Sequence, residues 1–266
     1  MDHLTVDALT GASGSLVGLV LGLVGGGGSI LAVPLLVYVV GIKSAHVAIG
    51  TSAIAVAVSA LANLLMHARA GNVKWRCALV FTIAGAIGAV GGSIVAKMID
   101  GQKLLVLFGV LMLVVGAMML RRGAGDGDPA VTLCRENARR LLPRLTAGGF
   151  GVGSLSGFFG IGGGFLIVPG LMLSTGMPIG YAIGSSLVSV TGFGATTASS
   201  YAISGLVDWR VAALFVSGGI LGGLAGTTLG RRLARQKRTL GFIFAGVVIA
   251  VGFYVVARAL PPLLGA

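Results

Sequence analysis

The chain is built from long uncharged runs separated by short charged segments. Runs without Asp, Glu, Lys or Arg cover residues 8–42, 46–66, 77–96, 104–120, 145–207, 211–230 and 239–257. A membrane-spanning helix needs about 17–25 predominantly apolar residues, and every run reaches or exceeds that length. The pattern predicts an all-α, polytopic membrane protein.

These runs fall into two groups on either side of one polar segment, residues 121–144. The segment holds six arginines and a stretch at 123–129 that is rich in Gly, Asp and Pro, which is typical of a loop. We therefore predict a first membrane repeat over 1–120, a cytoplasmic connector over 121–144 and a second membrane repeat over 145–266.

Three sequence blocks occur once in each half, in the same order. The pairs are GGSILAVP at 27–34 with GGGFLIVP at 162–169, AIGTS at 48–52 with AIGSS at 182–186, and GxVxWR at 71–76 with GxVxWR at 205–210. Their offsets are 135, 134 and 134 residues. One alignment of the two halves, with a shift of a single residue, therefore matches all three pairs. The sequence is that of a duplicated membrane protein, and internal repeats are common in transporters.

The positions of Lys and Arg select between parallel and inverted repeats, because cytoplasmic loops carry an excess of both. If the first run of each half crosses the membrane once, the repeats are parallel and the 19 basic residues divide into 11 and 8. If that run is a hairpin that enters and returns on one side, the basic residues divide into 14 and 5. The larger bias favours two inverted repeats, each with a broken, re-entrant hairpin and three transmembrane helices. Both termini are then extracytoplasmic.

Glycine clusters at 25–28 and 160–164 mark the predicted breaks in the hairpins. The apolar runs that follow are only about ten residues long, too short to span, so we expect half-helices that begin at the glycines. A helix N-terminus offers unpaired N–H groups and a partial positive charge, and glycine lets a bound group approach closely. Two such ends meeting near the midplane suit a small anion. Pro34 and Pro169 would kink the half-helices or leave a carbonyl free.

Polar residues on the helix after each break extend this candidate site. Ser52, Ser59 and Asn63 share one helical face by their spacing, and Thr197 occupies the position of Asn63 in the second half. The residues predicted to bind substrate are Gly27, Gly28, Ser29, Thr51, Ser52, Asn63, Gly162, Gly163, Gly164, Ser185, Ser186 and Thr197. The alternative for each Ser or Thr is that a small side chain lets neighbouring helices pack closely.

Composition narrows the function further. Charged residues make up 10% of the chain and 47 residues are Gly. The excess of 19 basic over 7 acidic residues is explained by membrane topology, so we predict no nucleic-acid partner. The uncharged runs offer neither a carboxylate proton relay nor a carboxylate cage for a metal, and the two cysteines lack disulfide or metal-ligand spacing. We expect no cofactor, no metal and no enzymatic activity.

Four basic side chains near the ends of the runs have two interpretations. His46 and His67 are either interfacial residues without a special role or titratable groups of the transport path. Arg76 and Arg210, which share a repeat position beside the two tryptophans, either anchor the helices at the interface or attract anions at opposite mouths of a cavity.

The GG[SG]xxxVP, IG[ST]S and GxVxWR pairs resemble the sulfite exporter TauE/SafE family, also called the 4-toluene sulfonate uptake permeases, over nearly the whole chain. The resemblance implies a protein of the bacterial inner membrane that moves sulfur-containing anions, such as sulfite or sulfonates, coupled to the proton gradient. The motif positions carried over are Gly27, Gly28, Pro34, Thr51, Ser52, Gly162, Gly163, Gly164, Pro169, Ser185 and Ser186. The first half has Gly28-Ser29 where the second has Gly163-Gly164, so the two halves need not contribute equally.

We therefore expect a multi-pass secondary transporter that works by alternating access on a sulfur-containing anion. Its partners are that anion, membrane lipids and protons as the coupling ion. The alternatives are a transporter of a metal cation or another oxyanion, a membrane subunit or enzyme that transports nothing, and a passive channel.

Overall fold

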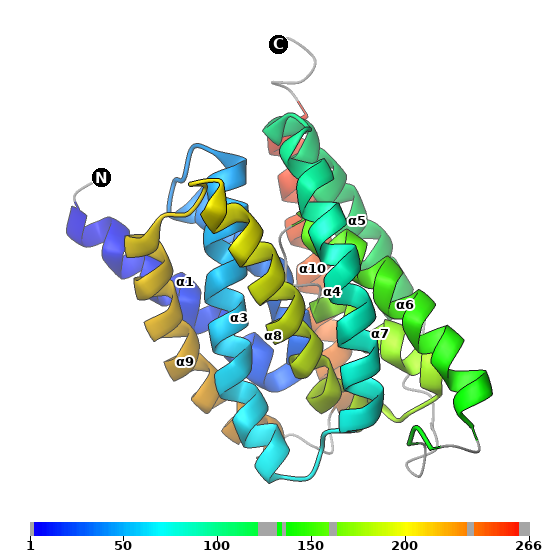
Figure 1. Cartoon of the computed structure of the whole chain (residues 1–266). Helices are drawn as coiled ribbons and strands as arrows, with labels where there is room; N and C mark the ends of the chain where they lie inside the picture. Colours follow the sequence, from blue (N-terminus) through cyan, green and yellow to red (C-terminus); the bar gives the residue numbers. More distant parts are fainter. Residues whose placement is uncertain (1–2, 122–131, 135–136, 160–163, 233–236, 261–266) are drawn as a thin grey trace.

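The computed structural model describes residues 3–121, 132–134, 137–159, 164–232 and 237–260, and every regular element in this part of the chain is a helix. The long helices of the first half are α1 (His3–Val24), α3 (Ala45–Arg69), α4 (Trp75–Lys97) and α5 (Gly101–Arg121). Those of the second half are α6 (Ala138–Phe159), α8 (Ile179–Ile203), α9 (Trp209–Arg232) and α10 (Lys237–Ala259). Shorter helices connect α1 to α3, namely η1 (Gly25–Leu31), α2 (Ala32–Pro34) and η2 (Leu35–Val39), and α7 (Gly164–Thr175) lies between α6 and α8. The helices form one bundle (Figure 1).

Five helices in the described residues are long and apolar enough to cross a membrane: α1, α3, α4, α5 and α9. The 25-residue helix α8 is rich in Ser and Thr, which lowers its hydropathy, and the apolar segment found in α10 is Ala245–Ala259. These findings confirm the predicted class, an all-α polytopic membrane protein. They also show that α1, which we expected to be one arm of a hairpin, is by itself long enough to span.

The two halves pack against each other rather than each around its own core. Helix α1 of the first half lies along α9 of the second, and α6 of the second half lies along α4 of the first. The other long helices pair across the halves as well, α3 with α8 and α5 with α10. Figure 1 shows α1 and α9 on one side of the bundle and α4, α5 and α6 on the other, with α3 and α8 between them.

Glycines at every fourth position allow the closest of these contacts. A Cβ added to Gly14, Gly18 or Gly22 on α1 would overlap the carbonyl oxygen of Phe215, Gly219 or Gly223 on α9. The equivalent glycines of α6, which are Gly149, Gly153 and Gly157, stand in the same relation to the carbonyls of Phe81, Gly85 and Ala89 on α4. Small residues at this spacing let membrane helices approach backbone to backbone, and they explain part of the glycine excess.

The register of the contacts gives the direction of each helix. Helices α1 and α9 run parallel, as do α4 and α6, because the paired residue numbers rise together along both helices. Helices α3 and α8 run antiparallel: Gly50, early in α3, contacts Tyr201, late in α8, and Gly194 contacts Ala57 midway. Helix α8, which aligns with α3 in the sequence, thus runs in the opposite direction to α3 within the bundle.

Each hairpin starts and finishes at one end of the bundle. The starts of α1, α3 and α9 lie together at what we call the N-terminal end, where Asp7 contacts Arg210 and the backbone N–H of Asp208 reaches Thr51. Helices α4, α6 and α8 start at the opposite end, the connector end, where the backbone N–H of Lys74 reaches Ser185. The chain thus leaves the N-terminal end through α1 and is back there when α3 begins.

The two prolines of the repeat blocks have different local surroundings. In the first half the glycine cluster forms a 3-10 helix, η1, that follows α1 directly, and the helix after Pro34 changes to a π-helix, η2. A proline lacks the N–H of the regular helical bond, and local 3-10 or π-helical turns are one way in which a membrane helix accommodates it. Pro169 instead lies inside α7, which continues as an α-helix through it.

One hydrogen bond between the halves occurs twice, at equivalent positions. Thr51 Oγ1 accepts from the backbone N–H of Asp208 at 3.0 Å, and Ser185 Oγ accepts from the backbone N–H of Lys74 at 2.9 Å. Both N–H groups directly precede a helix, α9 or α4, and both hydroxyls are fully buried. Each hydroxyl therefore holds the start of a helix that belongs to the other half.

Replacing Thr51 by Val should destabilise the protein by about 1–3 kcal/mol, because the N–H of Asp208 loses its partner in a partly buried place. Thr191→Val is the matched control, since its hydroxyl donates only to Leu187 O of its own helix at 2.8 Å. The midpoint of thermal unfolding in detergent measures both variants. An equal loss of stability in the two variants would contradict the role of Thr51.

Candidate functional site

The two segments that carry the glycine clusters meet inside the bundle. Helix η1 packs against α7, and both helices pack against α8. Ile30 of η1 and Ile167 of α7 are completely buried, so both segments reach the core of the bundle. The structure thus brings together the two half-helices on which the predicted anion site depends.

The glycines of the predicted site have different surroundings. A Cβ at Gly28 would lie 2.5 Å from the backbone nitrogen of Leu21 and 2.9 Å from the carbonyl oxygen of Val17, both on α1. Gly28 is therefore required for the close return of η1 along α1, whatever else it does. Gly27 belongs to η1 and Gly164 begins α7.

Two further predicted residues, Gly162 and Gly163, lie outside the described residues. The neighbour of Gly28 in the chain, Ser29, is completely buried. Substrate binding by all of these residues stays a prediction.

Asn63 and Thr197, which are equivalent in the two halves, both present a buried polar atom without a partner. Asn63 is 1% exposed and donates from Nδ2 to Ser59 O at 2.9 Å, but its Oδ1 has no hydrogen bond. Thr197 is 0% exposed and its Oγ1 has none either. An unsatisfied buried polar atom costs roughly 1–3 kcal/mol, and such atoms are rare in folded proteins. These two are the predicted site residues best placed to bind a ligand.

The other predicted hydroxyls are engaged by the protein. Ser52 Oγ donates to Ile49 O at 2.9 Å and Ser186 Oγ donates to Ile183 O at 2.7 Å, while Thr51 and Ser185 hold the helix starts described above. Short bonds of this kind to the preceding turn are the usual state of a hydroxyl inside a helix. Contact of these four residues with substrate remains a prediction.

Two residues outside the predicted set, Ser156 and Tyr201, also have a buried polar atom without a partner. Both are completely buried, and neither Ser156 Oγ nor Tyr201 OH has a hydrogen-bond partner. Ser156 lies in the last turn of α6 and aligns with Leu21 in the first half. Comparing the repeats therefore gave no signal for it.

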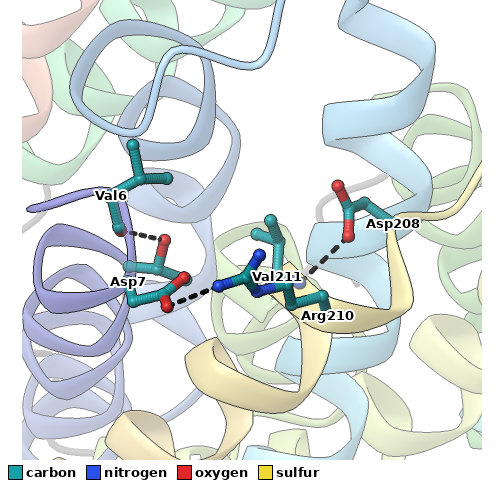
Figure 2. A network of polar contacts seen from close by, with 6 residues as sticks. Val6, Asp7, Asp208, Arg210 and Val211 are labelled. Atoms are coloured by element: carbon teal, nitrogen blue, oxygen red, sulfur yellow. Dashed lines mark hydrogen bonds and ion pairs between the residues drawn. The ribbon is translucent and has the colours of Figure 1, made fainter. Parts of the chain in front are cut away.

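Polar side chains at the N-terminal end tie the first hairpin to α9 (Figure 2). Arg210 Nη2 donates to Asp7 Oδ2 at 2.7 Å, and Asp208 Oδ1 accepts from the backbone N–H of Val211 at 3.1 Å, which caps α9. The Arg210 side chain is 61% exposed, so this ion pair contributes little to stability. At the connector end the equivalent Arg76 donates to Leu133 O at 3.4 Å instead. The charge of Arg210 is therefore matched by a carboxylate, whereas Arg76 contacts a carbonyl.

Two proteins with similar sequences are both named as probable membrane transporters. A protein of Xylella fastidiosa, strain Temecula1, named "Probable membrane transporter protein", is 49% identical over 258 residues, which cover 96% of this chain and 98% of the relative. YunE of Bacillus subtilis, named a probable membrane transporter protein, is 30% identical over 261 residues, 92% of each chain. No solved structure matches the chain.

The apolar helices and these relatives together define a multi-pass membrane transporter. The protein family follows from a comparison with family models, one of which matches residues 10–255, nearly the whole chain. The chain belongs to the sulfite exporter TauE/SafE family.

Proposed function

We propose that the chain is a secondary transporter of a small sulfur-containing anion, sulfite or an organosulfonate, and that it has no enzymatic activity. The observation that carries this proposal is the equivalent pair Asn63 and Thr197, each of which has one buried polar atom without a hydrogen-bond partner. The meeting of η1 with α7 supports it, since the start of α7 can add backbone N–H groups to the site. The family name supports the class of anion.

The proposed mechanism is alternating access between two inverted halves. The antiparallel course of α3 and α8 supports an inverted arrangement, and the positions of the charges support an orientation. Chain order assigns Lys43, Lys97, Lys103, Arg210 and Arg258 to the N-terminal end and the other 14 basic residues to the connector end. The positive-inside bias then puts the connector in the cytoplasm and both termini outside, in the bacterial inner membrane.

Coupling to protons, in this proposal, occurs through the substrate itself. No Asp or Glu is among the buried residues of the described chain, so no carboxylate there can relay a proton across the core. Asn63 Oδ1 can only accept a hydrogen bond, and a singly protonated oxyanion would supply one. The proton and the anion would therefore cross together.

Counterflow into proteoliposomes tests the proposal. Purified protein should exchange labelled sulfite against internal sulfite, and competition by sulfate, thiosulfate and simple sulfonates would define the substrate class. Internal unlabelled sulfite should drive labelled sulfite transiently above its external concentration, which a passive channel cannot do. Absence of anion flux, or flux of a divalent metal cation instead, would overturn the proposed function.

A further inference from the structure

Two hydroxyls beside α4, those of Ser156 on α6 and Thr197 on α8, lack the hydrogen bond to the preceding helical turn that their neighbours make. Thr196 Oγ1 donates to Gly192 O at 2.8 Å and Ser154 Oγ donates to Phe150 O at 2.9 Å. Hydroxyls in helices usually satisfy themselves in this way. Ser156 and Thr197 do not, although both are completely buried, so both are available to a ligand.

Contacts between α8 and α4 give the depth of Thr197. Phe193 packs against Gly85, and two turns further along Ser93 Oγ donates to Ser200 Oγ at 2.9 Å. Thr197 lies between Phe193 and Ser200, so it stands beside the turn of α4 that follows Gly85.

Contacts between α6 and α4 give the same depth for Ser156. Gly153 faces Gly85, and Gly157 faces Ala89 one turn further along. Ser156 lies between these two glycines and therefore beside the same turn of α4. Because α6 also packs against α8, the two hydroxyls belong to one junction of three helices.

The first half has no equivalent pair of hydroxyls. Leu21 occupies the position of Ser156 and Asn63 that of Thr197. Leu21 is completely buried, so at these two aligned positions the first half has one polar residue where the second half has two. Pseudo-symmetric positions thus differ in the number of hydrogen bonds they can donate.

The two junctions also lie at different depths in the bundle. Helices α3 and α8 cross where Gly194 contacts Ala57. With a rise of about 1.5 Å per residue, Asn63 lies about 9 Å beyond the crossing toward the connector end. Thr197 lies about 4.5 Å beyond it toward the N-terminal end. The two polar positions are therefore separated along the bundle rather than gathered around one point.

We infer that the chain holds two anion stations in series, and that Ser156 and Thr197 form the tighter one, on the side of the N-terminal end. This inference rests on the proposed function and extends it, because it replaces a single shared site by two unequal ones. An oxyanion with several oxygens, such as sulfite or a sulfonate, can accept from both hydroxyls at once. At the other station the amide of Asn63 and the side chain of Leu21 offer fewer donors.

The test compares Ser156→Ala with Ser154→Ala, its matched control two residues away. Counterflow gives the half-saturating sulfite concentration, and the rise in unfolding temperature on adding sulfite reports binding separately. We expect Ser156→Ala to raise the half-saturating concentration at least about tenfold, the loss of one hydrogen bond to a charged group. Ser154→Ala should stay within about twofold of wild type, and Ser156→Thr, which restores a hydroxyl, should recover most of the affinity.

Stability without sulfite separates binding from a structural role. Since the Ser156 hydroxyl has no partner in the protein, Ser156→Ala should unfold at the wild-type temperature or above it. If Ser156→Ala has the same half-saturating sulfite concentration as wild type, and wild-type protein transports sulfite normally, the station at Ser156 and Thr197 is overturned. The proposed function then remains intact. Wild-type protein that neither binds nor moves sulfite would overturn both.

Discussion

Replacing Gly92 by Leu should prevent the protein from accumulating in a folded state, whereas the same change at the adjacent Gly91 should be tolerated. A Cβ at Gly92 would overlap the carbonyl oxygen of Ser154 and lie 2.9 Å from the backbone nitrogen of Phe158. Both obstacles are backbone atoms of α6, so no change of rotamer relieves the overlap. We expect a cost above the roughly 1–3 kcal/mol that is typical of overpacking.

The yield of monodisperse protein after detergent extraction measures this effect. Gly91 is exposed, and a Cβ there meets no atom within 4 Å, so Gly91→Leu controls for helix propensity and added bulk at nearly the same depth. A cost of about 1.4 kcal/mol or more lowers the folding equilibrium constant at least about tenfold, so the yield of Gly92→Leu should fall well below that of Gly91→Leu. Equal yields would mean that α4 and α6 are not packed as closely as described.

Asn63→Leu is expected to reduce sulfite transport at least about tenfold while leaving stability unchanged or higher. Leucine has nearly the shape of asparagine, and replacing an unsatisfied buried polar group by an apolar one can be neutral or stabilising. The carbonyl of Ser59 would still accept its regular helical bond. Opposite changes in rate and stability are the signature of a group that the protein keeps for its ligand.

The initial rate of counterflow and the unfolding temperature are measured on the same preparation. Thr196→Val, which removes a hydroxyl bonded within its own helix at 2.8 Å, should change neither the rate of transport nor the affinity for sulfite. A fall in stability that parallels the fall in rate would assign Asn63 a structural role in the contact between α3 and α9.

Much of the fold could be predicted from sequence because membrane helices are marked by long uncharged runs. The runs at 46–66, 77–96 and 211–230 correspond to α3, α4 and α9. The repeat blocks likewise indicated a hairpin before α3 and another before α8. What the pattern could not reveal is that α1 packs on α9 and α6 on α4, since a face rich in glycine shows that a helix has a close neighbour without identifying it.

The candidate site was predictable only where the two halves resemble each other. Asn63 was found by its spacing with Ser52 and Ser59, and Thr197 because the repeats align it with Asn63; both have an unpartnered atom in the structure. Ser156 was missed because its counterpart, Leu21, is apolar. Sequence also cannot show which hydroxyls are already satisfied by a neighbouring backbone group, as those of Ser52 and Ser186 are.

Helix α1 of the first half packs on α9 of the second half, and this has a consequence for the synthesis of the protein. The first hairpin leaves the ribosome long before α9, its packing partner, has been synthesised. At about 5–20 residues per second, the roughly 200 residues between them take about 10–40 s. During that interval the glycine face of α1 has no partner from its own chain, so the insertion machinery or lipid must cover it. Neither half alone contains the contacts that would complete it, and assembly of the bundle therefore waits for the last quarter of translation.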